Sequence, residues 1–74
     1  MNLKKYKIVK KIILDFLTPQ DQYSRWCTEG FVEYNGTNTV WYINPSGEKE
    51  ETINTGDLIE LYIQRGILVE VKEN

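Results

Sequence analysis

The sequence predicts a small α+β domain, an antiparallel β-meander with two short helices in the order β-α-β-β-β-α-β. Three observations predict this class: alternating apolar residues near the N-terminus, two helix-start signals built on threonine and acidic residues, and short apolar segments separated by turn-forming dipeptides. The 74 residues contain no repeat, low-complexity tract or linker. We therefore expect residues 1–74 to form a single domain.

Residues 5–17 fit two structures. As a strand, one face would carry Tyr6, Ile8, Ile12, Leu14 and Phe16, with only Lys10 interrupting the alternation. As a helix, the apolar arc would run through Tyr6, Val9, Ile13, Phe16 and Leu17. Lysines near the helix N-terminus and an aspartate near its C-terminus would oppose the helix dipole, and the β-branched residues suit a strand. The strand is favoured, and the helix remains the alternative.

The next segment has the pattern of a short helix. Thr18 suits the N-cap, Pro19 the first helical position, and Asp21 the acidic first turn. Tyr23, Trp26 and Cys27 follow at the spacing of one helical stripe. We expect Gly30 to end this helix.

A β-meander is predicted for residues 31–53. Strands 31–34 and 39–43 flank Asn35-Gly36, a dipeptide typical of hairpin turns, and residues 44–47 form a second turn before a polar edge strand at 48–53. A loop of two or four residues would place Val32, Tyr34, Thr39, Trp41 and Ile43 on one face, and Phe31, Glu33, Val40 and Tyr42 on the other. Both faces would then carry aromatic residues, and the pattern does not decide which face is exposed.

The last two elements are a helix and a closing strand. Thr55 is the expected N-cap, Asp57 lies in the first turn, and Gly66 supplies the left-handed stop after Arg65. The predicted apolar stripe is Leu58, Leu61 and Tyr62. Residues 67–71 are the closing strand.

Charge divides the chain into two parts. Residues 1–28 carry six basic and two acidic side chains, for a net charge of +4, whereas residues 29–74 carry three basic and nine acidic side chains, for a net charge of −6. Such a dipolar molecule steers the association of charged partners. The charge division therefore indicates a binding role.

Size and cysteine content restrict how the fold is stabilised and where it works. A core this small is marginal alone, and Cys27 cannot form an internal disulfide, so we expect a homodimer. A lone thiol fits a reducing compartment, and lysines interrupt every stretch that would serve as a secretion signal or membrane span. We expect a cytoplasmic protein without a membrane segment.

Catalytic signals are lacking. The chain has no histidine, its glycines are isolated, and nothing activates Cys27. We therefore predict a protein that is not an enzyme and has no catalytic residues, metal site or cofactor.

The predicted function is binding. We expect a small inhibitor or adaptor that modulates another macromolecule, of the kind common in phages and mobile elements. Its predicted partner-binding residues are Trp41, Tyr34, Glu48, Glu50, Glu51, Asp57 and Glu60. This acidic and aromatic surface would suit a basic protein, including a nucleic-acid-binding protein reached by mimicry of nucleic acid.

The alternative is a module that binds nucleic acid directly. Its candidate residues are Lys4, Lys5, Lys7, Lys10 and Lys11, acting with aromatic residues of the sheet. An isoelectric point near 5.0 disfavours this alternative, because nucleic-acid binders are usually basic.

Overall fold

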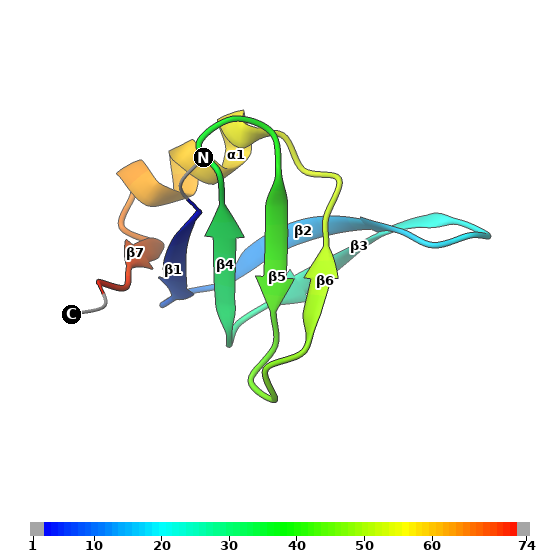
Figure 1. Cartoon of the computed structure of the whole chain (residues 1–74), viewed down its shortest axis with the longest axis horizontal. Helices are drawn as coiled ribbons and strands as arrows, with labels where there is room; N and C mark the ends of the chain where they lie inside the picture. Colours follow the sequence, from blue (N-terminus) through cyan, green and yellow to red (C-terminus); the bar gives the residue numbers. More distant parts are fainter. Residues whose placement is uncertain (1–2, 73–74) are drawn as a thin grey trace.

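Two antiparallel sheets and one helix make up residues 3–72, the part of the chain that the computed structural model describes (Figure 1). The elements are β1 (Lys4–Ile8), β2 (Ile12–Leu17), β3 (Gln22–Cys27), β4 (Phe31–Tyr34), β5 (Val40–Ile43), β6 (Lys49–Glu51), α1 (Gly56–Gln64) and β7 (Leu68–Glu70). One sheet has the order β6-β5-β4-β1-β7, and β2 pairs with β3 in the other. The predicted α+β class is confirmed, with one helix instead of two.

The core lies between the two sheets and the helix. The larger sheet contributes the buried side chains Tyr6, Ile8, Val32, Tyr34, Val40 and Tyr42 to its inner face, and the hairpin adds Ile12, Leu14, Phe16 and Cys27. Figure 1 shows the β2–β3 hairpin and α1 together behind the five-stranded sheet. Among the described residues, nothing covers the opposite side of this sheet, which we call the outer face.

Residues 5–17 are extended, as favoured, but they form two strands. The alternating residues from Tyr6 to Phe16 are all buried except Lys10. The chain leaves the larger sheet after Ile8, and β2 then pairs in the second sheet. Lys10 interrupts the alternation at the crossing between the two layers, which is why one long strand was the wrong prediction.

The predicted helix after Thr18 is wrong, because this segment is a turn followed by β3. The Thr18 hydroxyl oxygen accepts hydrogen bonds from the amides of Gln20 (3.3 Å) and Asp21 (3.0 Å), as an N-cap would. However, the Thr18 amide also donates to the Asp21 carbonyl, so the chain reverses. β3 then runs antiparallel to β2, with Leu17 opposite Gln22. Pairing with β2 provides backbone partners along six residues, which a helix of two turns lacks.

The β4–β5 connection has five residues, one more than the longer of the two predicted loops. The Asn35 side chain accepts hydrogen bonds from the amides of Thr37, Asn38 and Thr39, and the Asn35 amide donates to the Thr39 carbonyl. Tyr34 consequently pairs with Val40. Because side chains alternate between faces, this odd number of loop residues exchanges the two predicted faces of β5, so that prediction is wrong.

The helix near the C-terminus is confirmed, although its buried stripe differs. Its N-cap position is Thr55, its C-cap is Arg65, and Gly66 follows with φ of 72°. Ile59 is fully buried, and Tyr62 and Ile63 pack against the core, whereas the predicted stripe residue Leu61 is 38% exposed. The stripe at i, i+3 and i+4 therefore begins at Ile59, one residue later than predicted. The predicted polar edge strand and closing strand are present as β6 and β7.

Candidate functional site

The outer face combines apolar and charged side chains. Register and alternation assign to it Leu3, Lys5, Lys7, Phe31, Glu33, Trp41, Ile43, Lys49, Glu51 and Val69. Leu3 and Val69 are about half exposed, at 49% and 48%, and the two aromatic residues are partly exposed. The uncovered side of the sheet is therefore neither fully polar nor closed over by the rest of the described chain.

Two lysines lie against the aromatic rings of this face. Lys5 Nζ is 4.6 Å from the ring centroid of Phe31, and Lys49 Nζ is 5.4 Å from that of Trp41. Lys49 also forms an ion pair with Glu33, at 2.6 Å between Nζ and Oε1. That oxygen is buried, so the ammonium group stabilises the carboxylate of Glu33, the register partner of Trp41.

A shallow hollow of about 280 Å³ adjoins Trp41. Leu3, Asn35 and Thr39 complete its lining, so two apolar side chains meet one amide and one hydroxyl group there. The five-residue loop supplies Asn35 and Thr39. A hollow of this size has room for one large side chain of a partner.

The predicted acidic surface is dispersed in the structure. Tyr34 is buried, and its hydroxyl donates to Glu60 Oε2 at 3.1 Å, so this tyrosine and this acid connect β4 to α1. Glu50 lies on the inner face, paired with Arg25, and Glu48 is at the exposed β5–β6 turn. Asp57 is in the first turn of α1. Of the predicted partner-binding residues, the outer face holds Trp41 and Glu51, which are register partners.

The five candidate lysines are also divided. Lys5 and Lys7 lie on the outer face, whereas Lys4 lines a cleft that includes Tyr6 and Glu60. Lys10 and Lys11 lie between β1 and β2, and Lys11 Nζ is 4.5 Å from the ring centroid of Trp26 on the hairpin. The structure thus brings two of these lysines together with Trp41. It adds three residues that the sequence did not indicate: Phe31, Lys49 and Leu3.

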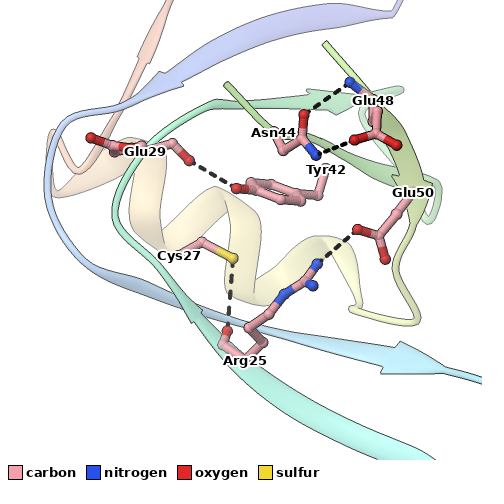
Figure 2. Close-up of polar contacts among 7 residues, drawn as sticks. All are labelled: Arg25, Cys27, Glu29, Tyr42, Asn44, Glu48 and Glu50. Carbon is pink, nitrogen blue, oxygen red and sulfur yellow. Dashed lines mark hydrogen bonds and ion pairs between the residues drawn. The ribbon is translucent and has the colours of Figure 1, made fainter. Parts of the chain in front are cut away.

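A second cluster connects the hairpin to the inner face. The Arg25 guanidinium donates to Glu50 Oε1 at 3.0 Å (Figure 2). It also lies 4.2 Å from the ring centroid of Phe16. The Tyr42 hydroxyl donates to the Glu29 carbonyl, and the Cys27 thiol points to the Arg25 carbonyl. These contacts hold β3 against β5 and β6, and so assign Glu50 to a structural pair.

Burial of Cys27 and Tyr42 in this cluster, and of Tyr34 between β4 and α1, makes the stability of the domain depend on pH. Desolvation is the main cause that raises the pKa of the Cys27 thiol above its ordinary value of 9.0, and it likewise raises the pKa of the Tyr34 and Tyr42 hydroxyls above 10.0. The unfolded chain therefore loses these protons first as pH rises. Stability that is complete below about pH 9 should decline above it.

We expect the urea midpoint of unfolding to be lower at pH 10 than at pH 7. In Cys27→Ala the part of this decline that begins near pH 9 should be smaller, because one of the titrating groups is removed. A wild-type midpoint that stays constant or rises over this range would contradict the assigned burial.

The described residues show no metal cluster and no relative identifies their role. No group of three histidine, cysteine, aspartate or glutamate side chains in residues 3–72 is placed to hold a metal ion. No helix within the same residues has the length and apolar character needed to cross a membrane. Comparisons with protein-family models, curated proteins and solved structures give no match. The outer face is therefore the basis for inferring the function of the domain.

Proposed function

We propose that this domain is a non-enzymatic binding protein that recognises another protein through its outer face. The observation that carries the proposal is the Trp41 hollow on a sheet face that no other described element covers. Tryptophan is among the residues that most often dominate the binding energy of an interface. Lysine and glutamate side chains around it supply the mixed polar rim that protein interfaces have. A cytosolic setting fits the lone buried thiol.

The charge distribution favours a protein partner over nucleic acid. Glu33 and Glu51 are the register partners of Trp41 on the two neighbouring strands. The Glu51 carboxylate would repel a phosphate backbone that follows the aromatic residues, and Glu33 already neutralises Lys49. Lys5, Lys7 and Lys49 on the same face are the observation that keeps direct nucleic-acid binding as a second candidate.

The positions of the acidic side chains do not favour mimicry of nucleic acid. Such mimicry needs acidic groups spaced along one surface. Here Glu50 is paired with Arg25 on the inner face, Glu60 accepts a hydrogen bond from Tyr34, and Asp57 lies on the helix. Trp41 and Glu51 remain from the predicted acidic and aromatic set.

Trp41→Ala should abolish capture of the partner. Removing a central interface tryptophan typically weakens binding by about 2 kcal/mol or more, which is roughly thirtyfold or greater. The measurement is affinity capture with the full chain as bait, followed by titration of the captured protein after its purification. Leu61→Ala is the matched control, since Leu61 is also partly exposed but lies on α1.

A parallel titration with single-stranded DNA and RNA at low and high salt tests the second candidate. Binding of nucleic acid that weakens steeply with salt and requires Lys5 and Lys7 would reject the protein-binding proposal. Equal capture by wild type and Trp41→Ala would reject the outer face as the site.

A further inference from the structure

The β3 edge of the hairpin has no partner among the described residues. β3 pairs only with β2, and its six residues make it longer than either β6 or β7, the edges of the larger sheet. Figure 1 shows the β2–β3 hairpin projecting beyond β6 at the far right. A long exposed edge is a template for pairing with another strand.

Hydrogen bonds on β2 show which backbone groups this edge presents. The Asp15 carbonyl accepts from the amide of Ile53, and the Ile13 amide donates to the Tyr62 hydroxyl, so both residues direct their backbone groups away from β3. Their register partners are Ser24 and Trp26. In an antiparallel pair these opposed residues share the non-hydrogen-bonded geometry. The amides and carbonyls of Ser24, Trp26 and, by the same alternation, Gln22 therefore point outward from β3, and of these the Gln22 amide donates to the Asp21 carboxylate at 2.8 Å.

This edge lacks two of the features that normally prevent pairing, because β3 contains neither proline nor lysine. Its one charged side chain, Arg25, points inward and is paired with Glu50. Three of the eight exposed large apolar side chains in the described residues lie on the hairpin: Leu17 (66%), Trp26 (57%) and Tyr23 (37%). An open edge with apolar neighbours favours a partner strand over solvent.

We propose that two copies of this chain pair through β3, antiparallel, across a two-fold axis at Ser24. In this register Gln22 lies opposite Trp26 of the second copy, and Tyr23 lies opposite Arg25 of the second copy, a ring against a guanidinium. The outward groups of Ser24, the Gln22 carbonyl and the Trp26 amide then have partners, and the Trp26 carbonyl accepts from the Gln22 amide of the second copy when this amide exchanges its bond to Asp21. The result is a continuous four-stranded sheet with the order β2-β3-β3-β2.

Other symmetric registers fit less well. A two-fold axis at Arg25 would place two guanidinium groups opposite each other, which is repulsive. A two-fold axis at Tyr23 would leave the outward groups of Trp26 without partners. The residues of β3 therefore suit pairing with a second copy of β3 about Ser24. Because such a contact is isologous, each cross-strand pair occurs twice.

The inference is independent of the proposed function. β3 belongs to the layer behind the larger sheet, so pairing there leaves both outer faces accessible. A dimer would present two copies of the Trp41 hollow and raise avidity for a partner with two sites.

Sedimentation equilibrium of the full chain across the micromolar range tests the inference. We expect a mass twice the monomer mass of 8.7 kDa. Ser24→Pro removes an outward amide but leaves the β2–β3 ladder intact, and by symmetry it removes two hydrogen bonds from the dimer. Dimerisation should weaken by about tenfold or more. Glu70→Pro, which removes an outward amide at the β7 edge, is the matched control and should remain dimeric.

A charge pair keeps the test decisive if proline disturbs the hairpin. Ser24→Glu alone should be monomeric, because two like charges would meet at the axis beside Asp15. Adding an equal amount of Ser24→Lys should restore a dimer. A monomeric wild type, or a dimer that persists in folded Ser24→Pro and Ser24→Glu, would overturn the inference.

Discussion

Leu14→Ala should destabilise the domain by about 3 kcal/mol, a large part of the stability available to so small a chain. Leu14 has no solvent exposure and lies on β2, the strand that brings the hairpin against the inner face. Truncation removes apolar contacts and leaves a cavity that the surrounding strands fill only in part. Urea unfolding followed by tryptophan fluorescence measures the change.

Leu17→Ala is the matched control for this substitution. Leu17 is the same residue type on the same strand, but it is 66% exposed. We expect its loss to change stability by less than about 0.5 kcal/mol. Equal effects of the two substitutions would show that β2 does not pack on the larger sheet.

Gly30→Ala should cost about 2–4 kcal/mol of stability. Gly30 has φ of 100°, a conformation that an alanine adopts only under strain. A Cβ atom there would also collide with the carbonyl oxygen of Ile43 and approach the Tyr42 ring to 3.2 Å. Tyr42 is held by its hydrogen bond to Glu29, and the Ile43 carbonyl belongs to the backbone of β5. Neither neighbour is therefore free to move away.

Gly36→Ala separates the two causes. Its φ of 87° imposes similar backbone strain, but no atom lies within 4 Å of the added Cβ. The expected cost is about 1 kcal/mol. If thermal unfolding showed no greater loss of stability for Gly30→Ala than for Gly36→Ala, the β3–β4 turn would not lie close to the end of β5.

Local patterns were sufficient to indicate extended chain at β1 and β2 and to locate α1. The alternation of Tyr6 and Ile8, and later of Ile12 and Leu14, correctly indicated extended chain, because a two-residue period places these side chains on one face. At α1, Asp57 in the first turn and Gly66 after the last turn correctly marked both ends. These signals depend only on neighbours in the sequence.

The hairpin could not be predicted in the same way. Thr18 bonds the following amides both at a helix N-cap and in the turn found here, so its pattern does not distinguish them. On β3 the inward residues are Tyr23, Arg25 and Cys27. Arg25 masked the two-residue period, and its burial depends on Glu50 and Phe16, which lie elsewhere in the sequence.

Loop length also limited the prediction of which residues surround Trp41. Trp41 was proposed as a binding residue from its residue type and its place in a strand. Its neighbours were assigned incorrectly because one additional loop residue exchanges the faces of β5, which separates Trp41 from Tyr34 and brings it beside Glu33. Lys49 joins them through β6. The hydrogen bonds of Asn35 fix the length of the β4–β5 loop, and the amino-acid composition of the loop does not reveal these bonds.

The most direct test of the outer face is photo-crosslinking in a lysate of the cells that make the protein. A photoreactive amino acid is placed at position 41 of the full chain, and at position 61 on α1 as the control. We expect a discrete, protease-sensitive adduct at position 41. Excess wild-type protein should suppress this adduct, whereas excess Trp41→Ala protein should not. A nuclease-sensitive adduct at position 41, or equal protein adducts at both positions, would contradict this expectation.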